Sequence, residues 1–236
     1  MKMNKEQLIS EIKNYFESEI IEKHQDNLLK KHSRLKNYQI NPILVRYLSQ
    51  LKENGVSAIG IAKALFYPRA LGTSISGSFG TKFQNMLIDL GLANPSLIGG
   101  MDVQYIDKLD DKEKYCQLKS GPSTINSKDV KPILDEFDRV ANLARANRDK
   151  ELSNNDLVVG IFYGDRTQLS AHYLKIDKRY PVLIGQEFWE RLTGFEDFYE
   201  KIIFEINNLI ADMPSNGVFN EALATLADEI ESSRIL

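Results

Sequence analysis

The sequence predicts an α/β protein in which a mixed sheet is flanked by helices and preceded by a helical N-terminal region. Residues 99–107 and 114–121 alternate apolar and polar side chains around a charged turn, which predicts a β-hairpin. Residues 157–163 form a continuous apolar run rich in β-branched residues, which is typical of a strand buried on both faces. Apolar residues at helical spacing predict one amphipathic helix over residues 5–36: Leu8, Ile12, Phe16 and Ile20.

The remaining elements follow from caps, breakers and periodicity. Asn41 and Pro42 open a helix that ends at Asn54. Residues 71–80 are rich in Gly, Ser and Thr, and we expect a hinge or a phosphate-contacting loop there. Further helices are expected over residues 57–66, 81–90, 129–148, 187–192, 198–211 and 218–232, and short strands over 170–174 and 182–184. We place the domain boundary between residues 1–75, the helical region, and residues 76–236, the core that carries the sheet.

Composition narrows the class of protein. The 236 residues are 42% hydrophobic and 27% charged with a net charge of -3, which are ordinary values for a globular protein. No apolar run approaches the roughly 18 residues of a membrane span, and we expect no signal peptide. Cys116 is the single cysteine, which excludes an intrachain disulfide. The cytoplasm is therefore the expected location. Basic residues gather in residues 23–36, as a solvated helix face or a DNA contact.

The predicted hairpin carries the most informative side chains. Alternation along a strand places Gln117 and Lys119 on one face and Leu118 on the other. The Asp102 carboxylate, the Leu118 carbonyl and the Gln117 amide oxygen are hard oxygen donors that suit a divalent metal ion. Lys119 can orient or deprotonate a water molecule beside it. This combination suits phosphodiester hydrolysis, and the alternative is a simple cross-strand ion pair between Asp102 and Lys119.

The sequence around these residues resembles a known protein family. Asp102 and Gln117-Leu118-Lys119 resemble the acid and acid-x-Lys pattern of the PD-(D/E)XK nuclease superfamily. Longer segments resemble type II restriction endonucleases of the TdeIII kind, over most of the chain from Ile61 to Phe198: residues 66–69, 72–75, 78–81, 114–122 and 185–189.

The resemblance implies a homodimer that cuts duplex DNA at a short palindromic site, such as GGNCC, with Mg²⁺. It implies products with a 5′-phosphate, and a cognate DNA methyltransferase in the same system. Residues 1–75 would then dimerise or embrace DNA, and residues 76–236 would form the nuclease core. Gln117 departs from the superfamily pattern, because a second carboxylate is usual there. A single-metal mechanism, or a further acid from elsewhere such as Glu113 or Asp89, would compensate for this lost charge.

Candidate DNA contacts are hydroxyl, amide and basic side chains in three places: in and beside the expected loop over residues 71–80, in residues 120–126 directly after the strand that ends at Lys119, and at His172. They are Arg69, Thr73, Ser74, Ser76, Ser78, Lys82, Ser120, Thr124, Asn126 and His172. Two other functions stay open. One is a nuclease of the same superfamily with a repair or modification-dependent task. The other is a non-catalytic DNA-binding regulator that uses the N-terminal helices.

Overall fold

The computed structural model describes residues 3–147, 152–213 and 217–233, apart from the side chains of residues 73–78. The chain divides into two compact units. The first, which we call the sheet unit, consists of Met1–Lys13 and Gly80–Asn207. The second, the helical unit, consists of Asn14–Phe79 and Asn208–Leu236. Each unit is described by itself below.

One mixed sheet of five strands organises the sheet unit. Its strands, in spatial order, are β1 (Asn94–Pro95), β2 (Val103–Ile106), β3 (Glu113–Lys119), β4 (Leu157–Ile161) and β5 (Val182–Ile184). The first three strands pair antiparallel, and β3, β4 and β5 pair parallel. The predicted hairpin is β2–β3, with Val103 opposite Cys116. This arrangement confirms the predicted α/β class with a mixed sheet.

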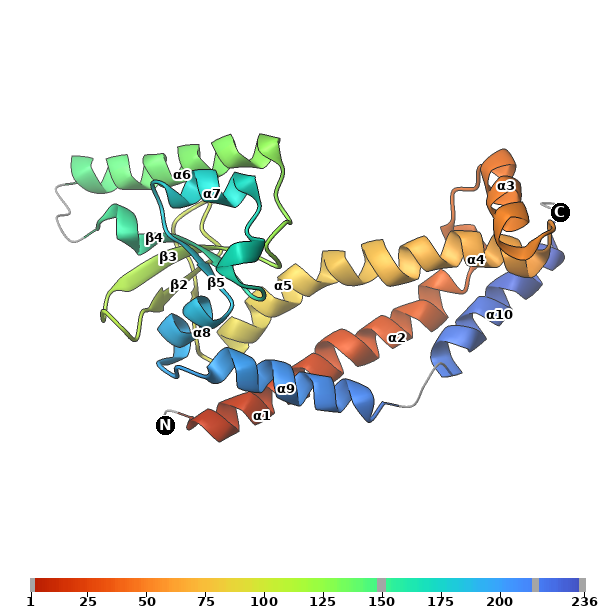
Figure 1. The fold of residues 1–236 in the computed structure, drawn as a ribbon, viewed down its shortest axis with the longest axis horizontal. Helices are drawn as coiled ribbons and strands as arrows, with labels where there is room; N and C mark the ends of the chain where they lie inside the picture. The colour runs from red at the N-terminus through yellow and green to blue at the C-terminus, as the bar shows by residue number, and fades with distance from the viewer. Residues whose placement is uncertain (1–2, 148–151, 214–216, 234–236) are drawn as a thin grey trace. The chain divides into compact units, whose positions relative to one another are not determined.

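Helices cover both faces of this sheet (Figure 1). On one face, α6 (Ser127–Ala146) and α7 (Ala171–Asp177) bury Phe137 and Tyr173 against Val159 and Ile161. On the other face, α8 (Gln186–Thr193) and the part of α5 (Ser74–Asp89) after residue 79 pack through aromatic rings. Phe188 and Trp189 are buried there.

The N-terminal helical run also follows the prediction. It comprises α1 (Lys5–Tyr15), η1 (Phe16–Glu22), α2 (Lys23–Asn27) and η2 (Leu28–His32). The two η segments are π-helical, and the short 3₁₀ segment η3 (Leu35–Asn37) follows. The helix predicted over residues 5–36 therefore ends at His32.

Caps define the next two helices as expected. The Asn41 side chain accepts from the amides of Ile43 and Leu44, at 3.1 Å each, and opens α3 (Pro42–Glu53). Ser57 caps α4 (Ala58–Pro68). α4 packs with α10 (Gly217–Glu231) around a buried apolar cluster that includes Ile61, Phe66, Leu226 and Ile230. α9 (Phe198–Ala211) completes the helices.

Two predictions of local structure are wrong. Residues 71–80 are helical, because π-helical η4 (Arg69–Thr73) continues directly into α5. The low helix propensity of Gly and Ser is a weak preference that helical neighbours on both sides override. Residues 171–174 belong to α7, which Ser170 precedes as the N-cap residue, and not to a strand: Tyr173 and Ile176 are buried at a spacing of three, which is helical. Short apolar runs leave helix and strand ambiguous.

Candidate active site

Asp102 lies just before β2, and its backbone and side chain are both bound. Its amide donates to the Cys116 carbonyl at 2.9 Å, and its carbonyl accepts from Gln84 Nε2 at 3.2 Å. Its Oδ2 accepts from the Leu118 amide at 2.7 Å. The carboxylate is therefore fixed against β3, and its Oδ1 is the oxygen not used in that bond.

Gln117 and Lys119 lie on β3, on the face of the sheet that α6 covers. Strand register sets Gln117 beside Val159 and Lys119 beside Ile161, both of which belong to the core under α6. Gln117 is 8% exposed, and its Nε2 donates to the Gly100 carbonyl at 2.9 Å. Because this bond uses the amide nitrogen, Oε1 is left as the acceptor of the same side chain. Lys119 is half-buried at the end of the strand.

Leu118 contributes its backbone. Along a strand, the N–H and C=O of one residue face the same neighbouring strand. The Leu118 N–H is bonded to Asp102, so its carbonyl also faces the Asp102 side of β3. The structure therefore brings the Asp102 carboxylate, the Gln117 amide and the Leu118 carbonyl to one edge of the sheet. Within the described residues, the Asp102 carboxylate accepts a hydrogen bond from the Leu118 amide and forms no ion pair with Lys119.

Cys116 lies behind this site on the opposite face of β3. It is fully buried, and a Cβ on Gly160 of β4 would lie 2.8 Å from its Sγ. Burial raises the pKa of the Cys116 thiol, the nearby Asp102 carboxylate raises it further, and Lys119 acts in the opposite direction. Cys116 is therefore a neutral packing residue, and both charged side chains act on it.

The turn before Asp102 holds residues that the sequence analysis did not single out. Gly100 has a positive φ of 86°, and a Cβ there would lie 2.0 Å from Glu136 Oε1. Arg139 Nη2 donates to the Gly99 carbonyl at 2.5 Å and to Glu136 Oε1 at 2.6 Å. Both side chains come from α6. The Gly99-Gly100 pair in the sequence was the only signal of such a close approach.

The acids expected to compensate for the neutral Gln117 lie elsewhere. Glu113 begins β3 and accepts from Gln104 and Tyr115, at 3.0 Å each. Four residues separate it from Gln117, or about 13 Å of extended strand. Asp89 is exposed at the end of α5. Of the carboxylates outside the hairpin, the structure brings Glu136 against the Gly99–Gly100 turn.

The loop after Lys119 is packed against α7. The Thr124 hydroxyl donates to the Gly121 carbonyl and bonds the Tyr173 hydroxyl, both at 2.9 Å. Asn126 caps α6 by accepting from the Lys128 amide at 2.8 Å. These two candidate DNA contacts are thus engaged within the fold. Ser120 and His172 are half-buried in the same unit.

The other candidate DNA contacts are spread over the chain. Arg69 belongs to the helical unit, where it donates to the Asn37 carbonyl and lies 5.1 Å above the Tyr38 ring. Lys82 is half-buried on the part of α5 in the sheet unit. The side chains of Thr73, Ser74, Ser76 and Ser78 lie outside the described part of the structure, and their backbone is helical.

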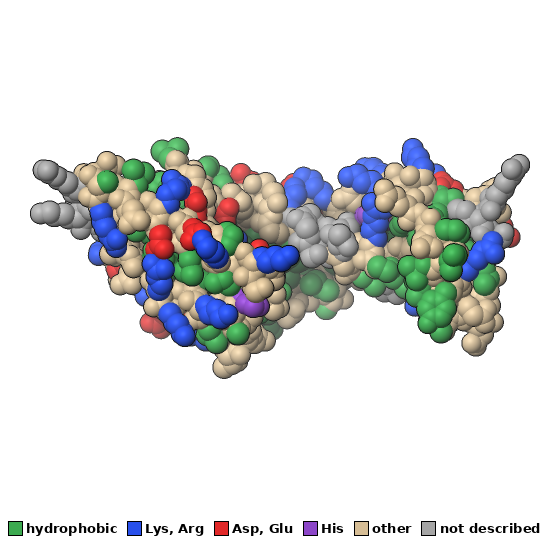
Figure 2. Space-filling model, turned by 90° about the horizontal axis from the view of Figure 1, so that it is seen from above, with side chains coloured by type: hydrophobic (Ala, Val, Ile, Leu, Met, Phe, Trp, Pro, Cys, Tyr) green, Lys and Arg blue, Asp and Glu red, His purple; other side chains and the backbone are tan. Residues whose placement is uncertain are grey.

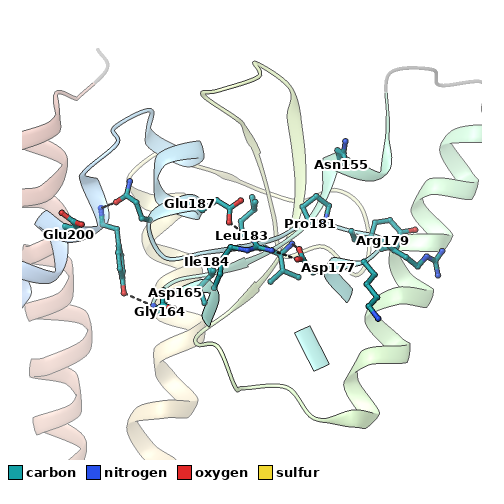
Figure 3. Close-up of a pocket in the computed structure, with 16 residues that line it drawn as sticks. Asn155, Gly164, Asp165, Asp177, Arg179, Pro181, Leu183, Ile184, Glu187 and Glu200 are labelled. Atoms are coloured by element: carbon teal, nitrogen blue, oxygen red, sulfur yellow. Dashed lines mark hydrogen bonds and ion pairs between the residues drawn. The ribbon is translucent and has the colours of Figure 1, made fainter. Parts of the chain in front are cut away.

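A cleft of about 880 Å³ lies along β5 and is separate from these residues (Figure 3). Arg166 donates to the Val182 carbonyl at 3.1 Å and to Glu187 at 3.0 Å, and it also pairs with Asp177. Asp102, Gln117 and Lys119 do not line this cleft. Among the charges that line the cleft, Arg166 pairs with Asp177 and Glu187.

The donor set at the hairpin fits a hard divalent cation. Mg²⁺ prefers oxygen ligands and keeps several of its waters, so it needs few protein ligands. Asp102, Leu118 and Gln117 supply a carboxylate, a carbonyl and an amide oxygen at one edge. Among the described residues, no group of three or more His, Cys, Asp or Glu side chains is arranged for a metal. The fit therefore requires neutral oxygen donors beside the single carboxylate.

A mixed five-stranded sheet with helices on both faces is consistent with a restriction-endonuclease-like fold. A family model for the type II restriction endonuclease EcoO109I matches residues 10–212, and the chain belongs to this family of site-specific DNA-cleaving enzymes. No curated protein matches the chain. Within the described residues, no helix is long and apolar enough to cross a membrane.

Proposed function

We propose that this protein is a magnesium-dependent restriction endonuclease that cuts both strands of duplex DNA at a short palindromic site. The observation that carries the proposal is the Asp102 carboxylate, bonded to the Leu118 amide at 2.7 Å on the strand that ends at Lys119. The family membership supplies site-specific cleavage of DNA. The geometry supports Asp102, Gln117 and Lys119 as the residues that perform it.

Each residue has a distinct role in this proposal. Asp102, the Leu118 carbonyl and the Gln117 amide oxygen would hold Mg²⁺, which lowers the pKa of bound water and neutralises phosphate charge. The Lys119 ammonium would orient the attacking water and stabilise the charge that develops on the phosphate. Hydrolysis would leave a 5′-phosphate and a 3′-hydroxyl. Lys82, Ser120 and His172 stay our predicted DNA contacts on the same unit.

The finer expectations come from the resemblance to enzymes of the TdeIII kind. We expect a recognition site similar to GGNCC and a partner methyltransferase that protects host DNA. We also expect the protein to act in the cytoplasm. A palindromic site has two-fold symmetry, and a two-fold pair of chains matches it with one Asp102–Lys119 site for each strand.

An exposed apolar face of α3 in the helical unit supports the homodimer. Ile43, Leu44, Tyr47 and Leu51 are 81%, 49%, 58% and 63% exposed, while Val45 is buried. Hydrophobic side chains gather on the visible surface of this unit (Figure 2). Large apolar side chains clustered on one helix face mark an interaction surface more often than a free surface. We propose that a second copy of this chain covers α3, since two sites are needed for a double-strand cut.

Introduction of a negative charge on α3 tests this assembly. Tyr47→Glu places a carboxylate in the proposed interface and is expected to yield monomers in light scattering, with cleavage of both strands reduced. Gln50→Glu adds the same charge at an exposed position one turn away on the same helix face, and it should weaken the assembly as well. A wild-type protein that is monomeric, with and without DNA, would contradict the homodimer.

Digestion of unmethylated plasmid DNA tests the activity. Discrete fragments with Mg²⁺, and none with chelator or with Lys119→Ala, are the expected result, and mapping their ends gives the site. Cutting restricted to methylated DNA would instead indicate the modification-dependent alternative. Metal-independent binding with no cutting of any substrate would indicate the regulator.

A further inference from the structure

We propose that Glu136 and Arg139 of α6 are a positioning pair that fixes Asp102 by holding the Gly99–Gly100 turn. The inference rests on the proposed role of Asp102 in the active site. Neither residue is proposed to contact DNA or metal. Through the turn that it holds, α6 would determine where the Asp102 carboxylate lies.

Arg139 bridges the helix and the turn. Its Nη2 donates to the Gly99 carbonyl at 2.5 Å and to Glu136 Oε1 at 2.6 Å, and its Nε donates to the same Glu136 oxygen at 3.2 Å. The planar guanidinium offers several donors in fixed directions, so one side chain can bind both groups. The Gly99 carbonyl is thereby tied to α6.

Glu136 approaches the turn at Gly100. A Cβ at Gly100 would lie 2.0 Å from Glu136 Oε1 and 2.2 Å from its Cγ, so only glycine allows this approach. The positive φ of 86° at Gly100 also favours glycine. From the other side, Gln117 Nε2 donates to the Gly100 carbonyl at 2.9 Å. The turn is thus held between α6 and β3.

The position of this turn decides the position of Asp102. The Met101 amide donates to the Ile98 carbonyl at 3.1 Å and closes the turn, and Asp102 follows directly. Asp102 then depends on its 2.7 Å bond with the Leu118 amide. A shift of the turn would lengthen this bond and move the carboxylate away from the Leu118 carbonyl.

The pair has little value for stability alone. The Arg139 and Glu136 side chains are 49% and 29% exposed, and ion pairs at such exposure contribute little to folding. Loss of either side chain should therefore change the position of Asp102 more than the stability of the fold. Groups that orient metal-binding residues typically change metal affinity or activity by about 10- to 100-fold.

The test compares Arg139→Ala with Lys131→Ala. Lys131 pairs with Asp135 on the same helix, with side chains 80% and 58% exposed, and thus serves as a matched ion-pair control. We expect Arg139→Ala to raise the Mg²⁺ concentration for half-maximal cleavage by about 10-fold or more, with the rate recovering at saturation. Its melting temperature should stay within about 2 °C of wild type. Lys131→Ala should match wild type in both respects.

A second readout requires no cleavage. In metal-free protein, we expect faster hydrogen exchange at the Leu118 amide in Arg139→Ala and Glu136→Ala than in wild type. Glu136→Gln keeps an acceptor oxygen for Arg139 and should restore most of the protection. Unchanged exchange at Leu118 together with an unchanged Mg²⁺ requirement in Arg139→Ala would overturn the proposal. A wild-type protein that never cuts would contradict the proposed function, while exchange at Leu118 would still decide the role of the pair.

Discussion

The two ends of the β2–β3 hairpin use polar residues in opposite ways. At the turn end, Lys114 is 2% exposed and donates to Asp110 and Asp156 at 2.7 Å each. Buried Asp107 accepts from Arg191 at 2.8 Å. At the other end, Asp102 is bound through a backbone amide, and Lys119 is half-buried.

This difference separates stability from function on one pair of strands. A buried charge is tolerated only when a partner and hydrogen bonds compensate its desolvation, and the turn end meets that condition. At the Asp102 end, within the described residues, the bond accepted by Asp102 Oδ2 and the bond donated by Gln117 Nε2 leave Oδ1 and Oε1 as the remaining side-chain oxygens. This is the end of the hairpin that we propose binds a cation and a phosphate.

Removal of the negative charge of Asp102 is expected to have the largest effect. Asp102→Asn keeps the shape and an oxygen to accept from the Leu118 amide, but it loses the negative charge that a metal ion requires. We expect the single-turnover cleavage rate to fall by at least about 100-fold. DNA affinity measured in chelator should stay within about threefold of wild type. A rate close to wild type would remove Asp102 from the active site.

Breaking the buried ion pairs at the turn end of the hairpin should affect folding instead. Lys114→Met leaves Asp156 buried without its cation, which typically costs about 3–5 kcal/mol in the free energy of unfolding. Urea denaturation measures this loss. Lys112→Met, at an exposed position of the same hairpin, is the control and should change little. A loss below about 1 kcal/mol in Lys114→Met would show that the buried pair is not essential for stability.

Gln117→Glu tests the role of the second side chain at the Asp102 end of the hairpin. The variant restores the acid of the superfamily pattern but has no N–H to donate to the Gly100 carbonyl, to which Gln117 is bonded at 2.9 Å. Loss of this bond to a backbone group should displace the turn. We expect cleavage to fall by about 10-fold, an effect comparable to losing one hydrogen bond in a site. Faster cleavage would instead show that a carboxylate is preferred at this position.

The smallest expected effect is the loss of Asp156's contribution to stability at low pH. Burial opposes ionisation of Asp156, but hydrogen bonds from Lys114 and Ser153 outweigh it and lower the pKa of Asp156 below its ordinary value of 3.8. A carboxyl with a lowered folded pKa stabilises the protein above its ordinary pKa, and this stabilisation is lost as the pH falls through the folded value. The stability difference between wild type and Asp156→Asn should thus shrink below about pH 3.8. A constant difference in denaturation from pH 6 to pH 2.5 would contradict this.

Local sequence patterns predicted much of the fold. Alternation predicted the β2–β3 hairpin, and the apolar run over residues 157–163 predicted β4, because both are buried in a sheet whose side-chain period is two. Asn41 and Ser57 predicted helix starts, since each satisfies free amides within its own first turn. Alternation also put Asp102, Gln117 and Lys119 forward as candidates.

Contacts over long sequence distances were beyond such patterns. Arg139 bonds a carbonyl forty residues away, and no local spacing marks it. Glu113 and Asp89 were expected beside Gln117, whereas Glu136 lies against the turn because α6 packs over that face of the sheet. Residues 71–80 were expected as a loop for their composition, yet helical neighbours decide their backbone.

Two lysines of β3 give the most direct test of whether the two ends of the hairpin separate catalysis from stability. Cleavage of duplex DNA with Mg²⁺ would be compared in Lys119→Ala and Lys114→Met, at a temperature where both variants are folded by circular dichroism. We predict that Lys119→Ala is folded and inactive, while Lys114→Met cuts at a rate near wild type although it unfolds more easily. An active Lys119→Ala, or a folded Lys114→Met without activity, would contradict the separation of stability and catalysis between the two ends of the hairpin.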